Sequence, residues 1–216
     1  MTARTLSPGD TQNAERLARL LEYPGLGDEL TLDAAGLARG LEVRPGAGSL
    51  ASAAHELAAF WAARSPSERE EIYVRTFDLQ APICLDVGYQ IFGESYKRGI
   101  FLVTMRQALR RHGLDEGSEL PDHLPAALRL LPRLAPEEEP RALVAEALLP
   151  ALAKMRAAAR GAELPYGRLL DLCEGWLRLA FDAPAGREPA RPELHLPVVE
   201  GTASPTRFFE GVNERD

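Results

Sequence analysis

Apolar residues in this chain recur at intervals of three and four, and prolines or glycines interrupt the pattern between one run and the next. The clearest run is 96–112, in which Phe101, Met105 and Leu109 would share one face of a helix. Gly113 follows this run, and glycine is common just past the end of a helix. Further runs that predict helices lie at 14–21, 34–41, 49–61, 67–79, 124–134, 143–159 and 164–181.

No segment alternates apolar and polar residues for long enough to predict a strand. The apolar segment 84–92 has some β propensity, but we interpret it as a helix or an irregular link. The sequence therefore predicts an all-α fold, a single helical bundle of roughly eight or more helices. Within this bundle, Ser67 and Glu70 have the spacing of a capping box, and Pro150 should kink the run 143–159.

The composition changes after Asp182, where five prolines occur within 34 residues. Proline lacks a backbone donor and cannot continue a helix interior. We therefore expect a helical domain at 1–182 and an extended, proline-rich tail at 183–216. A chain of 216 residues has the length of one ordinary domain with such a tail.

Charge and cysteine content narrow the class of protein. The net charge of −7 argues against general nucleic-acid binding. No apolar run approaches the roughly 20 residues of a membrane span, and residues 1–10 lack the apolar region of a secretory signal. Cys84 and Cys173 are far apart, which predicts a cytoplasmic protein with reduced thiols. The four histidines are isolated and no nucleotide-binding loop is present, so no metal or cofactor is expected.

The segment Glu119–Pro125 places Asp122 and His123 between two prolines, which makes its backbone rigid. One interpretation is that Asp122 caps a helix that begins at His123. A second is that the pair lies at the rim of a peptide-binding groove. A third is catalysis, in which Asp122 and His123 would serve a small helical, metal-dependent hydrolase. The residues themselves leave all three open.

A group of aromatic side chains and a basic helix precede this loop. The spacing of Tyr73 and Phe77 favours a place in the core, but a buried tyrosine hydroxyl needs a partner, so part of the group would line a groove. The basic side chains reverse the overall charge locally, either as a solvated helix face or as a dock for an acidic partner. They are Lys97, Arg98, Arg106, Arg110 and Arg111.

Three segments resemble the TorD/NarJ family of cytoplasmic chaperones for molybdenum enzymes, and its NarJ or delta-subunit branch most closely. Residues 73–78 read Y-V-R-T-F-D, residues 92–99 read F-G-E-S-Y-K-R-G, and residues 119–125 read E-L-P-D-H-L-P. Their order and spacing match the family. The segment Leu85–Gly88 departs from it, and a buried Asp86 there would need a partner.

The resemblance implies an assembly factor without catalytic activity. It would bind the N-terminal segment or leader of the apo catalytic subunit of a molybdopterin-dependent oxidoreductase, a nitrate-reductase-like member of the dimethyl sulfoxide reductase superfamily. It would assist molybdenum-cofactor insertion before targeting, together with proteins that deliver the cofactor. A helical adaptor for an unrelated peptide is a further alternative. The residues expected to bind or orient the client are Tyr73, Phe77, Tyr89, Phe92, Arg98, Leu120, Pro121, Asp122 and His123.

Overall fold

The computed structural model describes residues 6–78, 83–115, 117–159 and 165–183. These residues form helices and no named β-strand, which confirms the all-α prediction. The predicted tail, apart from Ala183, lies outside the described residues. None of the helices in the described ranges is both long and apolar enough to cross a membrane.

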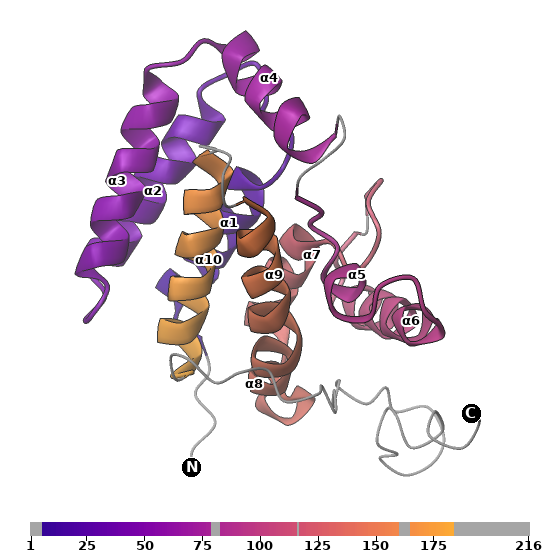
Figure 1. The fold of residues 1–216 in the computed structure, drawn as a ribbon. Helices are drawn as coiled ribbons and strands as arrows, with labels where there is room; N and C mark the ends of the chain where they lie inside the picture. The colour runs from indigo at the N-terminus through magenta and orange to yellow at the C-terminus, as the bar shows by residue number, and fades with distance from the viewer. Residues whose placement is uncertain (1–5, 79–82, 116, 160–164, 184–216) are drawn as a thin grey trace.

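Helices α1 (Pro8–Leu20), α2 (Glu29–Glu42), α3 (Gly48–Ala62) and α10 (Pro165–Phe181) pack together on one side of the molecule (Figure 1). Glycine permits one of these close approaches. A Cβ atom on Gly175 would lie 2.5 Å from Leu50 Cδ2, so the absence of a side chain lets α10 approach α3.

Helix α9 (Leu149–Ala159) packs between α10 and the short α5 (Val87–Phe92). The segment 84–92 was interpreted as a helix or an irregular link rather than a strand, and residues Val87–Phe92 of it are helical. Two short segments precede α9, namely α8 (Pro140–Ala142) and the π-helical η3 (Leu143–Leu148). Pro150 has no N–H to donate to the Glu146 carbonyl, and the π-helical turn lies directly before it.

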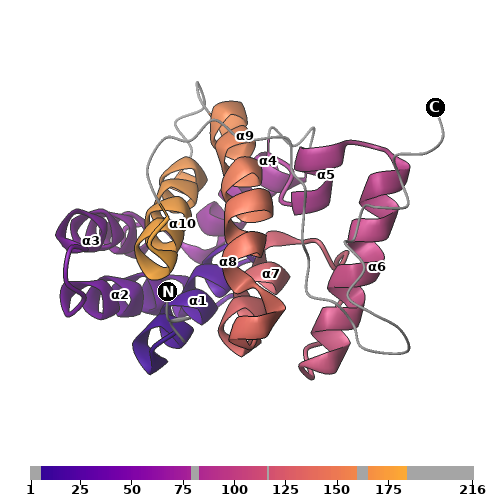
Figure 2. The same cartoon turned by 90° about the horizontal axis from the view of Figure 1, so that it is seen from below.

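Helix α6 (Tyr96–Arg111) lies at the far edge of the molecule from α2 and α3 (Figure 2). It ends as expected, with Gly113 in the left-handed region at φ 65°. A loop then leads to α7 (Leu124–Leu130), which continues into η1 (Leu131–Arg133) and η2 (Pro136–Glu138). Helix α7 packs against α1 and α6.

The N-terminal cap of helix α4 (Pro66–Phe77) lies two residues before the predicted capping box. The box is formed by Ser65, which accepts from the Glu68 amide, while the Glu68 carboxylate accepts from the Ser65 amide at 2.8 Å. The assignment to Ser67 and Glu70 was wrong, because Pro66 occupies the first helical position and moves the cap before it. Buried Arg69 anchors α4 by donating to the carbonyls of Trp61 and Gly27.

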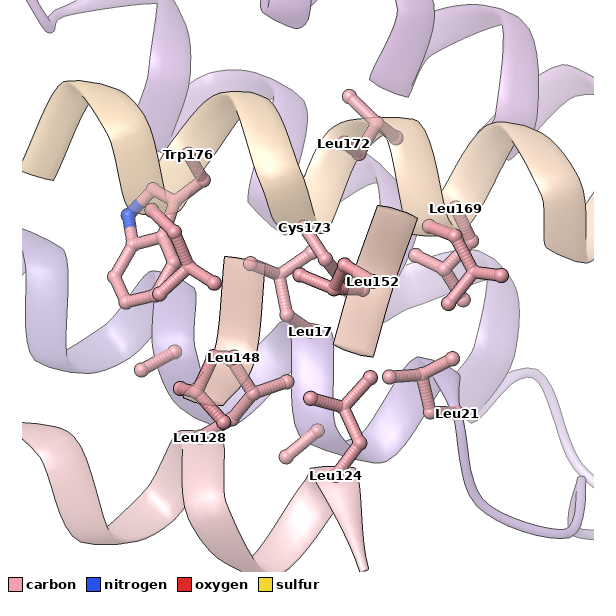
Figure 3. Close-up of a cluster of buried hydrophobic side chains, with 14 of the residues drawn as sticks. Leu17, Leu21, Leu124, Leu128, Leu148, Leu152, Leu169, Leu172, Cys173 and Trp176 are labelled. Atoms are coloured by element: carbon pink, nitrogen blue, oxygen red, sulfur yellow. The ribbon is translucent and has the colours of Figure 1, made fainter. Parts of the chain in front are cut away.

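The core is a layer of leucines between α1, α7, η3, α9 and α10 (Figure 3). Burying these side chains removes apolar surface from water, which is the main favourable contribution to folding. The labelled residues are Leu17, Leu21, Leu124, Leu128, Leu148, Leu152, Leu169, Leu172, Cys173 and Trp176.

Candidate functional site

The segment Glu119–Pro125 is fastened to the start of α5 by backbone hydrogen bonds. The Val87 amide donates to the Asp122 carbonyl at 2.8 Å, and the Leu124 amide donates to the Leu85 carbonyl at 3.0 Å. Asp86 and His123 thereby form an isolated antiparallel bridge. The rigid loop expected from its two prolines is thus held against a segment 35 residues earlier in the chain.

Asp122 does not cap α7, and that prediction was wrong. The residue before the helix is His123, which makes no side-chain capping bond. The Asp122 side chain is fully buried and accepts from the Gly88 amide at 3.0 Å and from Arg98 Nε at 3.4 Å. Its carboxylate is turned inward toward α5 and α6, so it is not exposed at the rim of a groove.

Arg98 lies between two carboxylates and one aromatic ring, and we call Arg98, Asp86, Asp122 and Tyr89 the Arg98 cluster. Arg98 Nη2 donates to Asp86 Oδ2 at 2.8 Å, and its guanidinium carbon lies 5.3 Å from the centre of the Tyr89 ring. Asp86 therefore has the partner that the sequence required. Burial, followed by repulsion from Asp86, raises the pKa of Asp122, while Arg98 opposes both effects.

A cavity of about 320 Å³ opens on the other side of this loop, between the end of α1, α4, the C-terminal end of α6 and the start of α7. We call it the aromatic groove. It includes Tyr73 and His123 of the predicted client-binding residues. The residues that line it are Glu22, Tyr23, Tyr73, Leu109, Leu114, Asp115, Gly117, Ser118, Glu119, His123, Pro125, Ala126 and Arg129.

The rings of Tyr23 and Tyr73 line part of the aromatic groove. Tyr23 is 57% exposed, and its ring lies edge-on to Tyr73 with centroids 5.2 Å apart. Behind Tyr73, the Phe77 ring lies 5.0 Å away and packs in turn on buried Tyr166 at 4.6 Å. Burial raises the pKa of Tyr73 to about 12, so its hydroxyl remains a neutral hydrogen-bonding group.

The groove is also lined by charged side chains. Glu22, Asp115 and Glu119 line the groove together with one base, Arg129. Arg129 is already bound, because its Nη2 donates to Glu22 Oε2 at 3.0 Å and its Nε donates to Glu15 Oε2 at 3.1 Å. Burial lowers the pKa of His123, so its imidazole is neutral at pH 7 and the groove keeps an acidic balance.

The nine predicted residues thus occupy different places. Tyr73 and His123 line the groove, Phe77 supports it, and Arg98, Asp122 and Tyr89 form the Arg98 cluster. Phe92 packs on Phe101, Pro121 is buried, and Leu120 is exposed without lining the groove.

Sequence reasoning missed Tyr23 as a residue of the groove. It also missed Glu22 and Arg129. No local pattern links these residues, because the fold brings Arg129 of α7 to Glu22 and Tyr23, which follow the end of α1. Among the described residues, no group of three or more His, Cys, Asp or Glu side chains is placed to hold a metal ion.

The fold and the groove define the class: a helical protein with an open, aromatic and acidic surface groove. The chain belongs to the nitrate reductase delta subunit family, whose sequence model matches residues 46–168, more than half of the chain. The match contains the three segments on which the resemblance to the TorD/NarJ family rested, and that resemblance is confirmed.

Two curated relatives agree with this assignment. Both are described as nitrate reductase molybdenum cofactor assembly chaperone NarJ, one from Escherichia coli strain K12 and one from Escherichia coli O157:H7. Each is 32% identical to this chain over 119 residues, which is 55% of this chain and 50% of the relative. The chain thus spans about half the length of the curated relatives it matches.

Proposed function

We propose that this protein is an assembly chaperone for a nitrate-reductase-like molybdoenzyme. It binds the N-terminal segment or leader of the apo catalytic subunit and assists insertion of the molybdenum cofactor before targeting. It acts by binding rather than by catalysis, in the cytoplasm, alongside proteins that deliver the cofactor. Family membership and the NarJ relatives support the chaperone role.

The aromatic groove is the observation that carries the binding part of the proposal. It offers an apolar wall made of Tyr23 and Tyr73 and an acidic edge made of Glu22, Asp115 and Glu119. An amphipathic peptide placed in such a groove buries its apolar face, and charged groups at the edge fix its register. The half-exposed Tyr23 ring is a suitable anchor because tyrosine buries a large area at low entropic cost.

The Arg98 cluster has a supporting role in this proposal. Arg98 and the Gly88 amide hold the Asp122 carboxylate, and the next residue, His123, lines the groove. Arg98 and Asp122 therefore position the groove wall without touching the client.

Calorimetric titration of the full chain with a peptide from the N-terminus of the host's nitrate-reductase-like catalytic subunit tests the proposal. Tyr23→Ala should raise the dissociation constant about tenfold or more, the effect of losing an interface anchor. Tyr96→Ala is the matched control, because Tyr96 is 79% exposed and lies outside the groove. Equal affinity of the wild type and Tyr23→Ala, or an equal loss in Tyr96→Ala, would refute the groove as the binding site.

Purification of the protein from its native host separates the chaperone from the alternatives. If the protein is the proposed chaperone, a large catalytic subunit should copurify with it, and most of that bound subunit should not yet contain molybdenum. If the protein were a hydrolase, it would turn over a substrate, and His123→Ala would abolish that activity. If the protein were an adaptor for an unrelated peptide, a protein other than a molybdoenzyme subunit would copurify with it.

A further inference from the structure

A second cavity, of about 340 Å³, opens beside α1 and is lined by four arginines, Arg16, Arg19, Arg129 and Arg133. We call it the arginine pocket. Glu15 is the one carboxylate among the described residues that line it. Four arginines around one small cavity are a local reversal of charge in a chain whose net charge is −7.

Two of the four arginines are held by acidic neighbours. Arg19 binds both oxygens of Asp33, with Nε at 2.7 Å and Nη2 at 2.5 Å. Arg129 binds Glu15 and Glu22, as described for the aromatic groove. Their charges are therefore largely neutralised, and their positions are fixed around the cavity.

The other two arginines have no such partner. Arg16 Nη1 lies 3.5 Å from Asn13 Oδ1, and Arg133 Nη1 donates to the His112 carbonyl at 3.3 Å. Within the described ranges, no carboxylate forms an ion pair with either of them. Because a guanidinium carries five N–H donors, most donors of Arg16 and Arg133 remain available to an anion.

Gly36 leaves room for the Arg16 side chain to lie against α2. A Cβ atom at Gly36 would lie 2.6 Å from Arg16 Nε and 3.1 Å from its Cζ, so the guanidinium rests against the backbone of α2 only because residue 36 has no side chain. A side chain fixed before binding loses less entropy when a ligand arrives.

We propose that the arginine pocket binds a small phosphate-bearing anion. Phosphate offers several charged oxygens that more than one guanidinium can contact, whereas a carboxylate offers two. The volume of the pocket suits a small molecule, at the lower end of the range for ligand sites. This inference does not depend on the proposed chaperone function.

Calorimetric titration of the full chain at low ionic strength tests the proposal, with inorganic phosphate, adenosine monophosphate and adenosine as probes. The two phosphate-bearing probes distinguish a free phosphate ion from a phosphate ester, and saturable 1:1 binding of either supports the site. Arg16→Gln/Arg133→Gln should weaken that binding at least tenfold. Binding of adenosine as tight as that of the monophosphate, or no saturable binding of either phosphate probe, would overturn it.

Two further variants separate the pocket from general charge effects. Arg75→Gln/Arg168→Gln removes the same charge from exposed positions outside the pocket and should leave the affinity unchanged. Gly36→Ala changes no charge but displaces Arg16, and it should weaken binding severalfold while circular dichroism shows an intact fold. An equal loss of affinity in the two double variants would show that only overall charge matters and would refute the site.

Discussion

Arg98 makes it possible for Asp86 and Asp122 to lie near each other at the edge of the core. Its guanidinium donates to both carboxylates, and the Gly88 amide supplies Asp122 with another donor. Two carboxylates around one arginine leave excess negative charge, which is why repulsion from Asp86 contributes to the raised pKa of Asp122. The close packing of these groups leaves no room for a larger side chain at Gly88.

Gly88→Ala should destabilise the protein by about 2 kcal/mol, the typical cost of overpacking a tight site. An added Cβ would lie 2.7 Å from both Asp122 Oδ2 and Phe101 Cδ1. Urea denaturation followed by circular dichroism measures the effect. Gly99→Ala is the control, since a Cβ at Gly99 meets nothing within 4 Å, and alanine there should be neutral or slightly stabilising. Equal stability of the two variants would contradict the packing argument.

His123 should make folding stability depend on pH. Burial lowers its folded-state pKa from the ordinary 6.5, so below pH 6.5 the unfolded chain binds a proton that the folded chain resists. The free energy of unfolding should therefore fall as the pH drops below 6.5, and His123→Gln should remove this contribution. Urea denaturation at several pH values measures it, with exposed His55→Gln as the control. Identical pH dependence in wild type and His123→Gln would disprove the assignment.

The Asp122 side chain shows where residue-level prediction fails. Aspartate before a proline-bracketed helix start satisfies the local rule for a cap. The folded chain instead uses that carboxylate to bind Gly88, 34 residues away in sequence. Local rules do not include such long-range partners, although they did identify the loop, Arg98 and the need of Asp86 for a partner.

Helix α4 carries Tyr73 and Phe77 of the aromatic wall, and its N-terminal cap fixes where it begins. Ser65→Ala should destabilise the protein by about 1 kcal/mol, because an orphan amide at the helix start loses its acceptor. Ser67→Ala, at the position where the sequence had predicted the cap, should have little effect, since Ser67 is exposed within the first turn. Urea denaturation of both variants decides between these positions, and a larger loss in Ser67→Ala would contradict the structure.

The presence of the helices was predicted well, because burial of one helix face makes apolar residues recur every three or four positions, and the sequence shows this spacing directly. The segments around α6 and α10 match their predicted ranges closely. Their starts were less predictable. Helix α2 begins at Glu29, several residues before the predicted Ala34, because its first turn buries only one apolar side chain, Leu30, and so carries little apolar periodicity.

At the scale of the whole molecule, both cavities depend on the same packing of α1 against α7. Arg129 of α7 lines the aromatic groove and the arginine pocket, and it is held by Glu15 of α1 and by Glu22, which follows α1. Such sites join residues more than 100 positions apart in the chain. Periodicity shows which face of each helix is buried, but it does not show which exposed faces become neighbours, so Tyr23 and Arg129 could not be assigned from sequence.

The packing of α10 also argues for the proposed domain boundary at residue 182. Cys173 and Trp176 complete the leucine layer in Figure 3, and α10 ends at Phe181. A chain that stops at residue 183 should therefore keep its helical content and change its free energy of unfolding by less than about 0.5 kcal/mol, a typical surface effect. A chain that stops at Leu172 loses Cys173 and Trp176 from the core and should not fold. Circular dichroism measures the helical content of each truncated chain, and urea denaturation measures its free energy of unfolding. A marked loss of stability in the 183-residue chain would show that residues 184–216 contribute to the fold and would move the boundary.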